Sequence, residues 1–156
     1  MTGSIKALLE EYKKVISELI RVITSLTGNQ ISIVADTETK DIECKSIQTV
    51  LTHTISSGYS YSVYIENSIG INSTRPKALT FDNVNKYIEQ LNIMFEYCEN
   101  IFKKFPDMEI EQLDNSKKIN TKWGQQYDVE QLLEHAIVHV LRHRRQIENF
   151  IKRLNN

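Results

Sequence analysis

The chain has 156 residues, with 19 basic and 20 acidic side chains and a formal net charge of −1. This length suits a single hydrophobic core, so we expect one domain over residues 1–156. The balanced charge argues against nucleic acid or an anionic membrane as a partner, and we find no apolar run typical of a membrane span or secretory signal. The two cysteines, Cys44 and Cys98, lie in dissimilar segments. A cytoplasmic protein with reduced thiols is therefore expected.

The first predicted helix covers residues 4–26, where apolar side chains recur at helical spacing and Ser4 is the expected N-cap. The polar stretch that follows it is predicted to form a loop. A second helix is expected to begin near Asp41 or Glu43. Gly58 lies in the middle of this helix and lowers its propensity by up to about 1 kcal/mol. Such a conflict needs a tertiary reason, either close helix packing or room beside a site.

Two further helices follow. The third is expected to start at its cap, Asp82, and to end before Pro106. The fourth covers residues 128–154, with Asp128 and Gln131 as a capping box. The connections between the four helices are too long for a simple up-down-up-down bundle. We therefore predict an all-α four-helix bundle with long crossover connections, as in up-up-down-down arrangements.

Histidines recur every four residues along the last predicted helix, at His135, His139 and His143. Because four residues leave a drift of only about 40°, the three imidazoles climb one helix face. Measured from the centre of the apolar stripe, His143 lies about 55° away, His139 about 95° and His135 about 135°. His135 is therefore the least suited of the three to be a ligand in a cleft between helices.

Two histidines one turn apart can share a metal ion, but a third ligand must come from elsewhere. His53, on the flank of the second predicted helix, is the only other histidine in the chain, and Tyr61 and Tyr64 share its face. If the second and fourth helices are neighbours, the three imidazoles form a facial site with open positions, which suits zinc, nickel or ferrous iron. The alternative is that these histidines are surface or partly buried side chains with no joint role.

Two separated blocks of sequence carry a family resemblance. They are SIQTVLTHTISSGYSYSVYI around His53 and LLEHAIVHVLRHRRQI around His139 and His143. Both resemble the DinB-like (YfiT-like) superfamily, bacterial proteins regarded as metal-dependent. The second block follows the family's pattern of a histidine, three residues, and a histidine followed by Arg-x-Gln-Ile. Arg145 is a departure, because the family commonly has a glycine there.

The resemblance implies a bundle whose second and last helices hold a divalent metal ion. In the family one histidine of the second helix and two of the last are the ligands, which carries over to His53, His139 and His143. The extra histidine, here His135, is often present without being a ligand. Zinc or nickel is the implied metal, with iron or manganese as alternatives, and a homodimer is the implied assembly.

Characterised members of this superfamily include enzymes that use low-molecular-weight thiols such as bacillithiol or mycothiol. The resemblance therefore implies a metal-dependent thiol transferase or hydrolase, with a small-molecule thiol as partner and an unknown substrate. The alternative is a non-enzymatic metal-binding or stress-response bundle that works as a homodimer. An open pocket would favour catalysis, whereas a closed site with four protein ligands would favour the alternative.

Other side chains have candidate roles beside the triad. The hydroxyls of Tyr61 and Tyr64 could orient water or substrate, and the arginines within residues 142–145 could pair with a carboxylate of a thiol cofactor. Packing and a solvated helix face are their simpler interpretations. Cys44, near the predicted start of the second helix, could have a lowered thiol pKa, although no paired cysteine supports a redox function. Cys98 lies on the third apolar stripe and is expected to be inert core.

Overall fold

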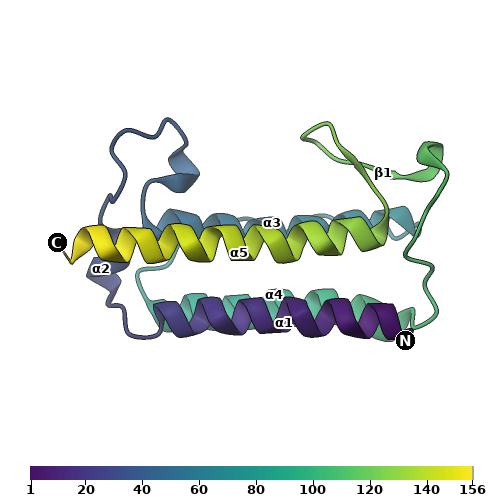
Figure 1. The fold of residues 1–156 in the computed structure, drawn as a ribbon, viewed down its shortest axis with the longest axis horizontal. Helices are drawn as coiled ribbons and strands as arrows, with labels where there is room; N and C mark the ends of the chain where they lie inside the picture. Colours follow the sequence, from purple (N-terminus) through teal and green to yellow (C-terminus); the bar gives the residue numbers. More distant parts are fainter. Residues whose placement is uncertain (156) are drawn as a thin grey trace.

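The computed structural model describes residues 1–155, and Asn156, the last residue of the expected domain 1–156, lies outside the described part. Four long helices form an elongated bundle, with the shorter elements in the connections (Figure 1). In chain order the elements are α1 (Gly3–Ile23), α2 (Gly28–Ser32), the 3-10 turn η1 (Ile42–Cys44), α3 (Ile47–Ser68), α4 (Val84–Lys104), the 3-10 turn η2 (Asn115–Lys117), β1 (Ile119–Asn120), β2 (Gln126–Tyr127) and α5 (Val129–Leu154). The predicted all-α four-helix bundle is confirmed. None of the helices within residues 1–155 combines the length and apolar character that a bilayer crossing requires.

The long helices are arranged as a ring around one apolar core. α1 packs against α4 and α5, and α3 packs against the same two helices. α1 and α5 run in one direction, and α3 and α4 run in the other (Figure 1). The side chain of Gln48, near the start of α3, donates hydrogen bonds to Phe81 O and Asp82 Oδ1 just before α4. Residues 69–83 therefore cross back along the bundle to join two parallel neighbours.

The crossover connection expected from the sequence is confirmed. The four long helices run up-down-down-up, however, and not up-up-down-down as in the arrangement named as an example. Only residues 69–83 connect parallel helices. The other two long connections join antiparallel helices that lie diagonally opposite in the ring, α1 to α3 and α4 to α5. Their length is needed to span the diagonal at an end of the bundle.

The start of α3 lies later in the sequence than predicted. Ser46 is its N-cap: the Ser46 hydroxyl accepts a hydrogen bond from Thr49 N, and Thr49 Oγ1 accepts one from Ser46 N. This reciprocal pair satisfies two backbone donors that the helix start leaves free. Asp41 instead caps η1 by accepting from Glu43 N. The expected start at Asp41 or Glu43 is therefore wrong, because η1 is a separate element that precedes α3.

The other helix starts differ less from expectation. Thr2 caps α1, two residues before the predicted cap. Asn83 caps α4 in place of the neighbouring Asp82, whose carboxylate accepts from Gln48 Nε2. The capping box predicted at Asp128 begins α5. Helix capping was thus predictable to within a few residues.

Two of the connections contain short ordered elements. α2 lies in the stretch after the first helix that was predicted to form a loop, and it buries Ile31 completely against the core. Residues 107–127 contain an antiparallel hairpin of β1 and β2. Its turn includes Gly124, whose φ of +84° is a conformation that glycine adopts without strain. The hairpin places Trp123 against Tyr61 and Tyr64 of α3 and against His135 of α5.

The close helix packing that was expected as a reason for Gly58 is present in the structure. A Cβ atom at Gly58 would lie 1.7 Å from Met94 Sδ and 3.1 Å from the Tyr12 hydroxyl. Met94 is fully buried, and the Tyr12 hydroxyl donates to its sulfur at 3.7 Å. The missing side chain therefore allows α4 to approach α3.

Replacing Gly58 with Ala should destabilise the protein. Displacing Met94 costs about 1–3 kcal/mol as overpacking, against a gain in helix propensity of about 1 kcal/mol, so we expect a net loss of up to about 2 kcal/mol in the free energy of unfolding. Urea unfolding measures it. Gly3→Ala is the control, since a Cβ there meets nothing within 4 Å. A Gly58→Ala variant more stable than wild type, as helix propensity alone would predict, would contradict the packing argument.

Candidate metal centre

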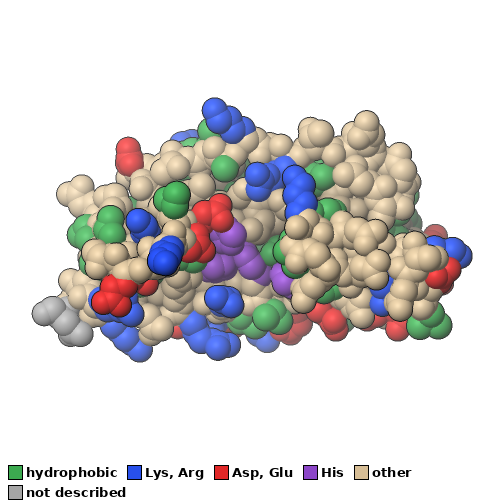
Figure 2. Space-filling model, turned by 90° about the horizontal axis from the view of Figure 1, so that it is seen from above, with side chains coloured by type: hydrophobic (Ala, Val, Ile, Leu, Met, Phe, Trp, Pro, Cys, Tyr) green, Lys and Arg blue, Asp and Glu red, His purple; other side chains and the backbone are tan. Residues whose placement is uncertain are grey.

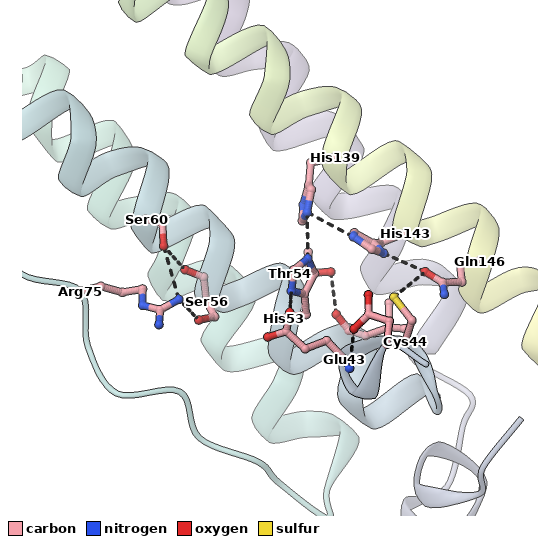
Figure 3. Close-up of polar contacts among 12 residues, drawn as sticks. Glu43, Cys44, His53, Thr54, Ser56, Ser60, Arg75, His139, His143 and Gln146 are labelled. Atoms are coloured by element: carbon pink, nitrogen blue, oxygen red, sulfur yellow. Dashed lines mark hydrogen bonds and ion pairs between the residues drawn. The ribbon is translucent and has the colours of Figure 1, made fainter. Parts of the chain in front are cut away.

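The packing of α3 against α5 brings three imidazoles from distant parts of the sequence together. His53 projects from α3, and His139 and His143 project from successive turns of α5 (Figure 3). His139 Nε2 lies 3.1 Å from His53 Nε2 and 3.2 Å from His143 Nε2. One ligand nitrogen from each residue lies within 4.8 Å of the others. This cluster could hold a metal ion, and metal binding by these three residues stays a prediction.

Hydrogen bonds on the outer edge orient two of the rings. His53 Nδ1 lies 2.9 Å from Glu43 Oε2, and His143 Nδ1 lies 2.9 Å from Gln146 Oε1. Because an ionised carboxylate and an amide oxygen only accept, both Nδ1 atoms must be the donors. Each neutral ring then has a lone pair on Nε2. Such outer partners commonly orient metal-binding histidines. Neither Glu43 nor Gln146 was predicted from the sequence to belong to the site.

A cation would remove the conflict between nitrogen lone pairs at the centre of the cluster. His139 Nε2 faces two nitrogen lone pairs and can donate a hydrogen to only one of them. An ion with imidazole nitrogens at about 2.0–2.1 Å separates adjacent nitrogens by about 2.8–3.4 Å in octahedral to tetrahedral geometry. The observed separations of 3.1 and 3.2 Å fall in this range. The residues present therefore fit a divalent ion.

Burial favours the neutral form of His139 and His143. His143 is 4% exposed, and His139 and His53 are half-buried. Desolvation, followed by the neighbouring imidazoles of His143 and His53, lowers the pKa of His139 to about 3. Desolvation also lowers the pKa of His143, against an opposing effect of its hydrogen bond to Gln146. Metal binding requires neutral imidazole, so both rings are ready for it at neutral pH.

His135 lies outside the cluster, in agreement with its position on the helical wheel. Its Nδ1 is 3.1 Å from the Tyr127 hydroxyl, and its ring stacks on Trp123 with centroids 5.5 Å apart. It therefore contributes to an aromatic wall one helical turn away from the three converging nitrogens.

A pocket of about 650 Å³ opens beside the cluster and includes His53 and His139 in its lining. Figure 2 shows the histidines at the bottom of a hollow in the surface. Tyr61 and Tyr64, singled out from the sequence, both line this pocket. Trp123 does so as well, although nothing in the sequence had connected the hairpin with the site. Small-molecule sites in proteins commonly have this size and aromatic character.

The arginines within residues 142–145 do not line the pocket. Arg144 pairs with Glu18 of α1 and, at 3.7 Å, with Glu148 one turn along α5. The side chains at positions 142 and 145 are exposed. Arg144 thus joins α1 to α5. The positions of these arginines give no support to the suggested pairing with a thiol cofactor.

The cysteines do not form a reactive pair. Cys44 lies in η1, and its Sγ is 4.0 Å from Gln146 Oε1. Burial is the largest cause of its raised pKa, so the lowered pKa suggested from a helix start is wrong. Cys98 is 2% exposed in the core, where burial raises its pKa to about 12.

Alanine substitutions should separate ligands from bystanders. We expect His53→Ala, His139→Ala and His143→Ala each to lose nearly all bound metal, because two imidazoles alone bind weakly. His135→Ala is the matched control and should keep about one ion per chain, as wild type does. Elemental analysis after metal loading and desalting measures the content. Equal losses in all four variants would show that the ligand set is wrong.

The metal-free protein should lose stability as the pH falls. His139 has a folded pKa of about 3, below its unfolded value, so the unfolded state binds more protons between these two values. Its contribution to stability is full above about pH 6.5 and decreases as the pH falls toward 3. Urea titrations of wild type and His139→Gln between pH 7 and 4.5 should show a shallower decrease in the variant. Equal slopes would contradict the depressed pKa.

Comparison with known proteins places this geometry in a family. The family model described as the DinB family matches residues 1–154, which include all four long helices and the three converging histidines. A comparison with curated proteins found no match. Since the family match covers nearly the whole sequence, the chain belongs to the DinB family.

Proposed function

We propose that this DinB-family protein is a metal-dependent enzyme that activates a small-molecule thiol, or water, against a small substrate. The observation that carries the proposal is the position of the triad. Three imidazoles converge at one end of an open pocket, and within residues 1–155 no fourth histidine, cysteine or carboxylate joins the cluster. A site with three protein ligands leaves a position for a reactant, whereas a structural site is usually closed by four.

The ligand set determines what chemistry is available. A divalent ion held by three neutral imidazoles keeps its full charge and lowers the pKa of a water or thiol that it binds. Glu43 and Gln146 hold the rings of His53 and His143 in place, which limits reorganisation during the reaction. We propose zinc or nickel as the metal, since both suit imidazole ligands, with iron or manganese as alternatives.

Transfer of a thiol has a simple balance. A carbon–sulfur bond forms to the substrate, the bond to its leaving group breaks, and the thiol proton passes to solvent. The Tyr61 hydroxyl is held in its protonated form, because desolvation raises the pKa of Tyr61. It could therefore donate a hydrogen bond within the pocket. A cytoplasmic location, which is part of the proposal, would supply reduced low-molecular-weight thiols.

The non-enzymatic alternative has less support. A storage or structural site needs no large pocket beside the metal, and this chain has one of about 650 Å³ lined by two of the three histidines. A homodimer is compatible with either function and stays a prediction. Exposed apolar side chains outside the core, such as Ile42 and Val138, leave surface for a second copy.

Activity should depend on both the metal and the triad. We expect zinc- or nickel-loaded protein to accelerate conjugation of bacillithiol with 1-chloro-2,4-dinitrobenzene, followed by absorbance of the product. The rate should fall about 100-fold or more in His139→Ala, because metal activation is worth several kcal/mol. Arg145→Gln, an exposed change outside the pocket, is the control. Metal-loaded protein without activity toward thiol conjugation or ester hydrolysis would favour the non-enzymatic alternative.

A further inference from the structure

The lining of the pocket includes two cationic side chains. Arg75 comes from the crossover connection between α3 and α4, and Lys122 comes from the turn of the β1–β2 hairpin. Neither forms an ion pair with any residue of the described part of the chain. They converge on the same pocket from segments that are distant in sequence. This leaves two positive charges without a protein counter-charge beside the proposed metal site.

Arg75 is held in a defined position. Its Nη1 donates to Ser56 Oγ at 2.6 Å and lies 3.4 Å from Ser60 Oγ (Figure 3). Ser56 is buried, and Ser60 Oγ is itself fixed by donating to Ser56 O at 3.0 Å. These bonds use one nitrogen of the guanidinium. The remaining donors of the planar group are free for a ligand, and such groups suit carboxylates and phosphates.

The serines also give the distance to the triad. Ser56 and Ser60 follow His53 by three and seven residues, so all three lie on one side of α3. A rise of about 1.5 Å per residue places them about 4.5 and 10.5 Å along the helix axis from His53. A small molecule can therefore contact Arg75 and the triad at the same time.

The charge of the pocket lining is one-sided. The chain has 20 acidic residues, yet no aspartate or glutamate lines this pocket. Glu43, the carboxylate nearest the triad, is engaged by His53 Nδ1. Figure 2 shows basic side chains around the hollow that exposes the histidines, together with acidic side chains at its edge beside the histidines. A divalent ion would add to the positive potential, so the pocket favours anions and disfavours cations.

Aromatic rings form the other part of the lining. The Trp123 ring meets Tyr61 and Tyr64 edge-on, with centroids 6.1 and 5.8 Å apart, and stacks on His135. The Tyr64 hydroxyl accepts a hydrogen bond from Lys122 N at 2.9 Å, which attaches the hairpin turn to α3. The rings are thus fixed relative to Arg75. They offer apolar surface to a planar group in the ligand.

From these observations we propose that the pocket binds a small organic anion, with its carboxylate or phosphate on Arg75 and Lys122, its planar apolar part against Trp123, and its reacting end at the triad. The inference rests on the proposed function, since it identifies the substrate class of the same site. The anion subsite itself consists of side chains of this chain alone. It can therefore be tested in metal-free protein.

Trp123 is the only tryptophan in the chain, so its fluorescence reports on the pocket. Metal-free full-length protein is titrated with phenylacetate and with phenylacetamide, a neutral analogue of the same shape. We expect phenylacetate to bind about tenfold or more tightly, because charge-assisted hydrogen bonds to a guanidinium exceed neutral ones. Arg75→Gln should remove this preference, and Lys122→Gln should reduce it. Arg145→Gln, outside the pocket, should leave it unchanged.

Equal affinities for the two compounds, no binding of either, or an unchanged preference in Arg75→Gln would overturn the subsite. Circular dichroism and zinc content check that the Arg75→Gln fold and triad are intact, and Lys122→Gln gives an independent reading if they are not. The two proposals fail separately. Protein that binds zinc without discriminating the compounds loses only the anion subsite, and protein that discriminates them without binding any metal loses only the proposed metal chemistry.

Discussion

The packing of α3 against α5 is the constraint on which the site depends. It places His53 beside two histidines that are more than eighty residues away in sequence, with Nε2 atoms 3.1 and 3.2 Å apart around His139. Hydrogen bonds to Glu43 and Gln146 then direct lone pairs toward a common point. The single Nε2 of His139 can donate to only one of these two lone pairs, so one of them stays without a donor unless a cation lies between the rings. The geometry is therefore compatible with metal binding, and the ligand set stays a prediction.

Other features of the fold support the contact between α3 and α5 and the pocket beside it. Gly58 allows α4 to approach α3, and Ser46 starts α3 so that Glu43 in the preceding turn reaches His53. The parallel arrangement of α3 and α4 requires the crossover of residues 69–83, and that crossover delivers Arg75 to the pocket. A connection that topology demands thus also supplies a binding residue. This agrees with the tendency of function to reside on loops held by a rigid scaffold.

The sequence predicted much of the fold because α1, α4 and α5 have a strong apolar period. It also predicted that His139 and His143 lie nearer the core than His135, since their angular positions follow from helical geometry alone. Periodicity carries no information about which helices are neighbours, so the convergence of His53 with α5 needed the structure or the family resemblance. Glu43 was interpreted as a helix start, and Trp123 lies in a hairpin formed by two residues on each strand. Such short elements depend on tertiary contacts that no local pattern records.

X-ray absorption spectroscopy of the zinc- or nickel-loaded protein tests the central claim most directly. We expect three imidazole nitrogens at about 2.0–2.1 Å, with the remaining coordination completed by exchangeable light atoms. Addition of a small-molecule thiol should then introduce one sulfur at about 2.3 Å. A first shell containing a protein sulfur before thiol addition, or four imidazole nitrogens, would contradict an open site built by His53, His139 and His143.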